Sequence, residues 1–241
     1  MSYLIFRGVS TENLQDVYVS QMPSHKKGAM RMTEYYVKGR DGALHVNEGY
    51  SNFDVQAVLV LVNGGATARQ QVNAWADGTG KLITSDDLTK AYKATVIDEI
   101  RWKRVKAHSH PGVNGYVESG LFDTATITFN CEPFMYEAVD SVIELTATES
   151  ILNPGSADAY PLIEVIGSGD ASFTFNDDEI EIDGMASETP VYIDCENGYV
   201  YTASGAATMR GEIPHFGLGV NTITFGSNVS NIIITPRWRW I

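Results

Sequence analysis

The stretch Val191–Thr202 (VYIDCENGYVYT) decides the fold class, because two strand-like runs flank the dipeptide Asn197-Gly198. Asn-Gly accepts positive φ at both central positions of a type I′ turn, so the stretch predicts a tight β-hairpin. A two-residue turn would place Cys195 opposite Val200. One face of this hairpin would then carry Tyr192, Asp194, Glu196, Tyr199 and Tyr201.

Two further strand-like runs follow, and they lead into an unusual tail. Val220–Phe225 and Val229–Thr235 are separated by Gly226-Ser227-Asn228, which predicts a second hairpin. The tail Pro236–Trp240 (PRWRW) would place both arginines on one side and both tryptophans on the other if it stays extended. The C-terminal quarter therefore reads as antiparallel β-structure.

The residues before this quarter continue the same pattern of short strands and turns. Ser141–Ala147 and Leu162–Ile166 are strand-like, and Ser172–Phe175 and Ile180–Asp183 predict a hairpin around Asn176–Glu179. Many short strands with turn signals and no helix are typical of a β-sandwich.

The first half also predicts mainly strands, with one helix. Phe53–Val62 alternates at first and then becomes apolar on both faces, as in a strand covered on both sides. Thr67–Gln70 matches a capping box, and Gly78 supplies a helix end. The apolar face of this helix would carry Ala68, Val72, Trp75 and Ala76. Further strands are expected at Tyr3–Arg7, Asp16–Ser20, Glu34–Lys38, Leu44–Asn47, Tyr92–Lys103 and Thr124–Cys131.

A methionine-rich and basic segment, Met22–Thr33 (MPSHKKGAMRMT), precedes the predicted turn Gly39–Gly42. Unbranched methionine side chains repack easily, so one interpretation is an adaptable arm that contacts a neighbouring subunit. The alternative is a solvated, mobile loop. The residues that would carry the arm are Lys26, Lys27, Met30, Arg31 and Met32.

Charge divides the chain near residue 137. The formal net charge is −13, with 17 Lys and Arg against 30 Asp and Glu. Residues 1–137 hold 14 basic and 15 acidic residues, whereas residues 138–241 hold 3 and 15. This asymmetry predicts two domains, 1–137 and 138–241. The acidic second domain would be repelled by phosphate and by anionic lipid, which disfavours direct binding to nucleic acid or membrane.

No pattern in the sequence predicts catalysis, a cofactor or a metal site. His108 and His110 lie close together, but no third ligand follows at a defined spacing, so a loop is preferred over metal binding. Asn176–Glu179 lacks the spacing of an EF-hand, so a solvated acidic turn is preferred over a calcium site. Cys131 and Cys195 are predicted to be buried free thiols, and no signal peptide is visible, which favours assembly in a cytoplasm.

The order of several short motifs carries more information than any one of them. The series consists of GRDGAL (39–44), the helix with Trp75, KLITSDD (81–87), YKATV (92–96), TITFNCEPF (126–134), IDCENGYVY (193–201), RGEIP (210–214), GVNTI (219–223) and ITPRWR (234–239). Over nearly the whole chain this series resembles the distal tail proteins (Dit) of long-tailed bacteriophages of Gram-positive hosts. Val105–Glu118 departs from the family pattern, so no role is carried onto it.

The resemblance implies a mainly β protein with two domains. The N-terminal domain would be a β-sandwich-like, ring-forming domain with one α-helix, and the C-terminal domain a galectin-like antiparallel β-sandwich. The chain would form a homohexameric ring, single or stacked, in the virion tail tip after synthesis in the host cytoplasm. It would join the tail tube protein to the tail-associated hub protein and often carry receptor-binding proteins, without sequence-specific contact to nucleic acid and without membrane insertion.

Two kinds of function compete at the level of sequence, and a third, a tail-associated hydrolase, would need a carboxylate pair or a metal site that the sequence does not identify. The first is a structural assembly hub, with Met22–Thr33 as an inter-subunit arm and the face with Tyr199 and Tyr201 as a docking surface for a partner. The second is a carbohydrate-binding module in which the C-terminal sandwich recognises cell-wall glycan. The usual galectin sugar-site runs are not present in this sequence.

Overall fold

The computed structural model describes residues 4–6, 9–21, 28–62, 66–77, 92–94, 101–108, 114–118, 122–137 and 140–241. The chain divides into two compact units, Met1–Ala138 with Ile241 and Val139–Trp240. In the described part the structure is mainly antiparallel β-sheet with one α-helix, which confirms the predicted fold class. No helix among these residues has both the length and the apolar character that crossing a membrane requires.

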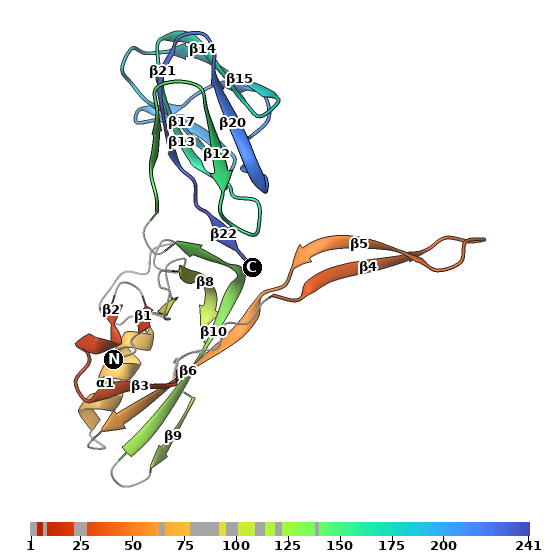
Figure 1. Cartoon of the computed structure of the whole chain (residues 1–241). Helices are drawn as coiled ribbons and strands as arrows, with labels where there is room; N and C mark the ends of the chain where they lie inside the picture. Colours follow the sequence, from red (N-terminus) through yellow and green to blue (C-terminus); the bar gives the residue numbers. More distant parts are fainter. Residues whose placement is uncertain are drawn as a thin grey trace. The chain divides into compact units, whose positions relative to one another are not determined.

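An antiparallel sheet forms the body of the first unit, in the strand order β2-β1-β7-β8-β10-β6-β3, with β9 also paired to β10. Figure 1 shows the long strands β6 and β10 of this sheet beside the helix α1 (Ala66–Asp77). The strands of the sheet are β1 (Leu4–Phe6), β2 (Val9–Ser10), β3 (Val17–Gln21), β6 (Phe53–Val62), β7 (Tyr92–Ala94), β8 (Arg101–His108), β9 (Asn114–Glu118) and β10 (Phe122–Glu137). The single strand predicted at Tyr92–Lys103 is wrong, because Tyr92–Ala94 and Arg101–His108 are separate strands and Lys93 pairs antiparallel with Trp102.

Alternation along the two longest strands creates the core of this unit. Leu59 of β6 pairs with Ala125 of β10, and Ala57 pairs with Ile127, so buried side chains lie opposite one another. The helix α1 (Ala66–Asp77) packs into the same core. Its predicted face is confirmed, since Ala68, Val72, Trp75 and Ala76 are all buried.

The capping box predicted from Thr67 is wrong. The helix begins at Ala66, so Thr67 lies in the first turn and does not cap the helix.

Two polar contacts fix the orientation of α1. The Trp75 indole Nε1 donates to the Val9 carbonyl at 2.9 Å. The Arg69 guanidinium donates to Asp123 Oδ2 from Nε at 2.9 Å and from Nη2 at 2.5 Å. Because Asp123 is almost fully buried, this charge-assisted contact replaces the water that the carboxylate loses.

The second unit is a sandwich of two antiparallel sheets with strand orders β11-β21-β13-β16-β17-β18 and β12-β20-β14-β15-β19. The strands of the first sheet are β11 (Ile143–Leu145), β13 (Leu162–Gly167), β16 (Val191–Asp194), β17 (Tyr199–Thr202), β18 (Gly205–Ala206) and β21 (Val229–Thr235). The strands of the second are β12 (Glu149–Asn153), β14 (Gly169–Phe175), β15 (Asp178–Met185), β19 (Met209–Arg210) and β20 (Gly219–Phe225). The chain ends in β22 (Arg239–Trp240).

Alternate residues of both sheets enter one apolar core, as expected for strands with one solvated face. Ile163 and Val165 of β13 belong to this core together with Phe173 and Phe175 of β14 in the other sheet. The hairpin predicted around Asn176 is confirmed, and its turn is short because Phe175 pairs directly with Asp178.

The second hairpin predicted from the sequence is wrong, although both strands have nearly the predicted bounds. β20 pairs with β12 and β14, whereas β21 pairs with β11 and β13, so residues 226–228 cross between the two sheets. Backbone hydrogen bonds hold this crossing, from Gly226 N to Ser172 O at 3.0 Å and from Ser172 N to Ser227 O at 2.9 Å. A Cβ on Gly226 would lie 2.5 Å from Ser172 O, which explains the glycine.

Candidate docking surfaces

The first candidate surface is the hairpin of β4 (Met30–Tyr36) and β5 (Ala43–Tyr50), which form a two-stranded sheet of their own (Figure 1). Its loop is longer than the tight turn that Asp41-Gly42 predicts. Tyr36 pairs with Ala43, and Arg40 N donates to Val37 O at 3.1 Å. Gly39 and Gly42 have φ values of 84° and 79°, so the two glycines supply the left-handed positions of the loop.

Large apolar side chains of this hairpin are exposed. Tyr35 pairs with Leu44 and Thr33 pairs with Val46, so one face carries a short apolar row. Tyr35 is 52% exposed, Leu44 39% and Val46 47%. The other face carries Met32 and the still more exposed Tyr36. The predicted arm did not include Tyr35, Leu44, Val46 and Tyr36.

The structure describes three of the five residues predicted to carry the arm. Lys26 and Lys27 fall outside the described residues. Met30, Arg31 and Met32 belong to β4, so the loop alternative is wrong for this part of the segment. The Arg31 guanidinium donates to the Glu48 carbonyl across the hairpin at 2.8 Å, which fixes its side chain along β5.

The second candidate surface is the outward face of the sheet that contains β16 and β17. The hairpin between these strands is confirmed, but its register differs from the prediction: Ile193 pairs with Val200 and Asp194 pairs with Tyr199. The turn therefore contains four residues, and only Gly198 has positive φ, at 70°. The shift is two residues, so side chains keep their predicted faces.

The Asp194 side chain explains the longer turn. Its carboxylate accepts hydrogen bonds from Asn197 Nδ2 at 2.8 Å and from the backbone N–H of Glu196 at 3.3 Å. The Gly198 N–H donates to the Asp194 carbonyl at 2.8 Å. An aspartate that bonds to the backbone two residues later stabilises a turn locally, and this competes with the two-residue Asn-Gly turn.

Side chains from several strands form one continuous outward surface, called the tyrosine face below. Across the sheet, Ile233 pairs with Glu164, Glu164 with Tyr192, and Tyr192 with Tyr201. The tyrosine face consists of Glu164, Tyr192, Asp194, Tyr199, Tyr201 and Ile233.

The aromatic part of the tyrosine face is partly exposed. The rings of Tyr192 and Tyr201 stack with their centroids 5.3 Å apart and their planes inclined by 20°. Tyr199 is 66% exposed and Tyr201 37% exposed. The stack holds two aromatic rings in fixed orientation at the surface, which is a geometry that a flat partner group can contact.

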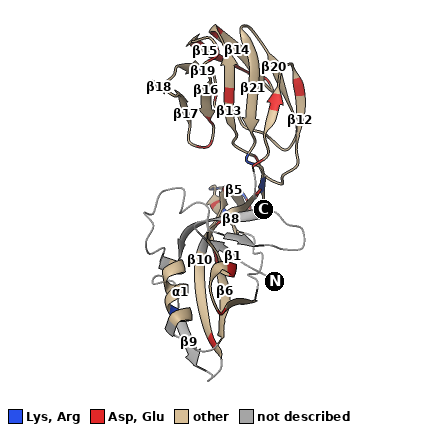
Figure 2. Ribbon diagram, turned by 90° about the vertical axis from the view of Figure 1, so that its left-hand side faces the viewer, with Lys and Arg blue, Asp and Glu red and all other residues tan. Residues whose placement is uncertain are grey.

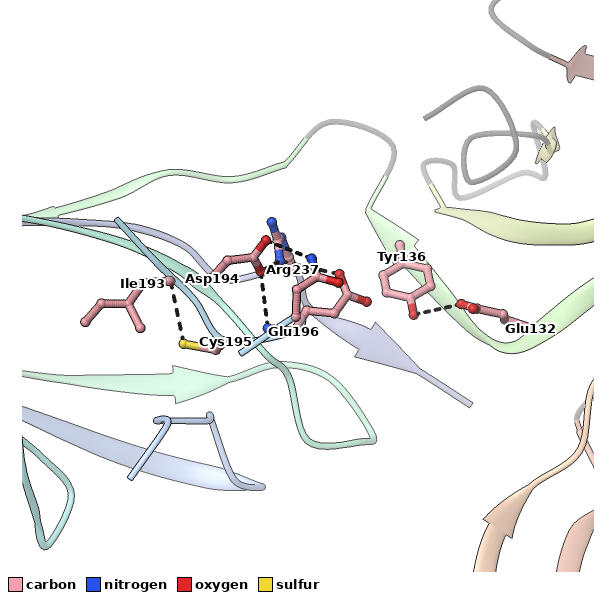
Figure 3. Close-up of polar contacts among 8 residues, drawn as sticks. Glu132, Tyr136, Ile193, Asp194, Cys195, Glu196 and Arg237 are labelled. Carbon is pink, nitrogen blue, oxygen red and sulfur yellow. Dashed lines mark hydrogen bonds and ion pairs between the residues drawn. The ribbon is translucent and has the colours of Figure 1, made fainter. Parts of the chain in front are cut away.

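Arg237 occupies the acidic part of the predicted docking surface (Figure 3). Its Nη1 lies 2.7 Å from Asp194 Oδ1 and 3.4 Å from Glu196 Oε2. The side chains are 21%, 14% and 26% exposed for Arg237, Asp194 and Glu196 respectively. Both acidic residues of the predicted docking surface are therefore paired with a cation of the same chain, and the sequence analysis did not identify Arg237 as their partner.

This contact decides the protonation of Asp194. Partial burial raises the pKa of the carboxyl, but hydrogen bonds from Arg237 and Asn197 and the positive charge of Arg237 outweigh it, so the pKa lies below that of an ordinary aspartate. A carboxyl with a lowered pKa stabilises the fold above its unfolded pKa, and the contribution disappears as pH falls through the folded pKa.

Replacing Asp194 with asparagine is therefore expected to destabilise the second unit by about 2 kcal/mol at neutral pH, the size typical of a hydrogen bond to a charged group. The difference between the variant and the wild type should shrink as pH falls from about 5 to about 2. Urea unfolding across this pH range measures both effects. Asp183→Asn is the matched control, because its partner Arg210 is 66% exposed and the loss should stay below about 1 kcal/mol.

Both cysteines are free and buried, as predicted. Burial and the neighbouring Asp194 raise the pKa of the Cys195 thiol to about 12, although Arg237 opposes the shift. The Cys195 thiol therefore stays protonated at neutral pH and is a poor nucleophile.

The tail does not stay extended, so the condition on which the division into an arginine side and a tryptophan side depended is not met. Arg237 has φ of 54°, which turns the chain immediately before Trp238. Trp238 is buried at 4% exposure and Trp240 packs at the edge of the core. Arg239 lies elsewhere, with its guanidinium carbon 4.6 Å from the centre of the Tyr160 ring.

The described residues do not form a metal-binding site at either of the positions considered from the sequence. His108 ends β8, and His110 lies outside the described part. Within that part, no group of three His, Cys, Asp or Glu side chains is placed to hold a metal ion. Acidic positions are spread over the strands and turns of the second unit, where basic positions are few (Figure 2).

Comparison with known proteins gives a match in structure and none in sequence. No protein-family model matches the chain, and no curated protein matches it. The crystal structure of the SPP1 Dit (gp 19.1) protein, described as a paradigm of the hub adsorption apparatus in Gram-positive infecting phages, matches with a TM-score of 0.67 at 14% identity, covering 100% of both chains.

Two structures of the phage P2 baseplate in its activated conformation are also similar. The one with Ca has a TM-score of 0.48 at 13% identity and covers 98% of this chain and 97% of that chain. The one with Sr has a TM-score of 0.44 at 11% identity and covers 97% and 96%. The match to SPP1 Dit alone shows that the chain has the fold of a Dit protein over its whole length, and this confirms the fold that the resemblance in the sequence implied.

Proposed function

We propose that the protein is a structural component of a phage tail tip that forms a hexameric ring, single or stacked. The ring joins the tail tube to the tail hub and to components that recognise the host, and its role is mechanical and not catalytic. The fold supports this proposal, because SPP1 Dit, described as part of a hub adsorption apparatus, matches along the full length of both chains.

The β4–β5 hairpin is the observation that carries the proposal. A single two-stranded hairpin is at best marginally stable in water, because each strand has only one neighbour and both faces meet solvent. Tyr35, Leu44 and Val46 nevertheless form an exposed apolar row on it, with Met32 and Tyr36 on the opposite face. Burial of this row against a second copy of the chain would stabilise the hairpin and link neighbouring subunits.

The two units then take different roles. We assign ring formation to residues 1–137, which contain the hairpin and an almost balanced charge, and partner docking to residues 138–241. Copies of a nearly neutral domain can pack closely without strong repulsion, whereas an acidic domain is better placed away from its own copies. The inter-subunit arm in this proposal is the whole hairpin, including Met30, Arg31 and Met32, together with the preceding Lys26 and Lys27.

Light scattering coupled to size exclusion tests the proposal on the purified full-length chain. The expected mass is that of six copies of the 26.4 kDa chain, or of twelve if two rings stack. Electron microscopy of the same fraction should show sixfold rings with a central opening. A mass of one chain at every protein concentration would contradict the proposal.

A further inference from the structure

We infer that the tyrosine face binds arginine side chains in a positively charged segment of a partner protein. This inference rests on the proposed function, because it names the chemistry of the partner that docks on the second unit. Four strands contribute to the surface, β21, β13, β16 and β17, so its side chains are held by backbone pairing and not by a mobile loop.

The row across the sheet places the Glu164 carboxylate beside two stacked rings, while a second carboxylate, that of Glu144, lies on the far side of Ile233. Glu164 is the register partner of Tyr192, which is in turn the partner of Tyr201. On the other side of Glu164 lies Ile233, which is partly buried. A guanidinium that lies over the tyrosine rings would also reach the carboxylate, and its aliphatic stem could contact Ile233.

Arg237 shows that this face accepts a guanidinium. From the tail of the same chain it reaches the neighbouring row and binds Asp194 and Glu196. The two other basic residues of the unit are engaged elsewhere: Arg210 contacts Glu181 and Asp183, and Arg239 contacts Tyr160. No cation within residues 140–241 is therefore left for Glu164, so the positive charge would come from a partner.

Charge decides between the classes of ligand. Residues 138–241 hold 15 acidic and 3 basic residues, so a wall polymer that carries phosphate would be repelled. A neutral saccharide could stack on the tyrosines but would gain nothing from the negative field around them. An arginine side chain is stabilised both by stacking on the tyrosines and by the negative charge around them. It stacks on aromatic rings better than lysine because its guanidinium is planar and weakly hydrated.

Isothermal titration of the full-length protein with short synthetic peptides tests the inference. The probes are a peptide in which arginine alternates with threonine, its lysine counterpart, and a neutral oligosaccharide of N-acetylglucosamine. The arginine peptide should bind at least about threefold more tightly than the lysine peptide. Glu164→Gln and Tyr201→Leu should each weaken binding of the arginine peptide about fivefold.

Matched variants separate this surface from the general negative charge. Glu179→Gln removes the same charge from the other sheet and should change affinity less than about twofold. Tyr201→Phe keeps the stacked ring and should bind like the wild type. The inference is overturned if Glu164→Gln and Tyr201→Leu leave the affinity for the arginine peptide unchanged, or if the lysine peptide binds equally well. It is also overturned if the protein binds the oligosaccharide and not the arginine peptide.

The mass of each sample, measured by light scattering, keeps the two proposals apart. If the protein stays a single chain but binds the arginine peptide at the tyrosine face, the ring proposal fails and the inference stands. If rings form and the peptide does not bind there, the inference fails and the ring proposal stands.

Discussion

Replacing Tyr35 and Leu44 together with serine is expected to weaken the contact between ring subunits about a hundredfold. The two residues are cross-strand partners on β4 and β5 and are 52% and 39% exposed in the single chain. If docking buries both, the change removes apolar contact worth about 3 kcal/mol at each interface, which corresponds to that loss of affinity. Light scattering across a dilution series should show that the ring dissociates at much higher protein concentration than the wild type.

A matched control on the second unit distinguishes this effect from a general loss of surface hydrophobicity. Leu152 of β12 and Val220 of β20 are also cross-strand partners, and they are 62% and 67% exposed. The double change to serine there should leave the mass of the ring unchanged. If the control dissociates the ring as strongly, or if the hairpin variant leaves its mass unchanged at all concentrations, the hairpin is not the inter-subunit contact.

The length and type of many elements follow from the sequence because their causes are local. Phe53–Val62 is a strand with the predicted bounds, since its alternation matches the pleat and its neighbours on both sides are apolar. The face of α1 with Val72 and Trp75 is buried for the same kind of reason. An apolar period of two residues predicts a strand and one of 3.6 residues predicts a helix, and either can be recognised without knowing which element packs against it.

Pairing depends on contacts between distant residues, and there the local signals mislead. Gly226-Ser227-Asn228 looks like the loop of a hairpin, yet hydrogen bonds to Ser172 send the chain across to the other sheet. Asn197-Gly198 favours a two-residue turn, yet Asp194 binds the turn backbone and lengthens it. In both cases a hydrogen bond outside the turn signal outweighs the preference of the dipeptide.

The candidate surfaces were predictable only in part. The tyrosine face follows from alternation, which survives a register shift of two residues. The engagement of Asp194 by Arg237 could not be foreseen, because the two residues are 43 positions apart and Arg237 adopts a left-handed backbone. The hairpin face with Tyr35 was missed, although alternation in Thr33–Tyr35 and Leu44–Val46 gave a signal for it.

The tail that carries Arg237 also completes the core of the second unit, through Trp238. Its ring centroid lies 4.8 Å from that of Phe216, which is itself 5.0 Å from that of Phe175. Phe216 is fully buried and is held by two backbone hydrogen bonds with Ala159, at 2.9 and 3.0 Å. The aromatic cluster therefore joins Trp238 of the tail, through Phe216, to Phe175 of β14.

Trp238→Ala is accordingly expected to lower the free energy of unfolding of the second unit by about 3–5 kcal/mol, the usual loss when a buried tryptophan leaves a cavity. Hydrogen exchange of peptides from β13 and β21 measures this unit separately from the first. Trp238→Phe keeps an aromatic contact with Phe216 and should lose about 1–2 kcal/mol, and so should Trp240→Ala, which removes a partly buried ring. If Trp238→Ala and Trp240→Ala lower the free energy of unfolding equally, Trp238 contributes no more to the core than a partly buried residue at its edge.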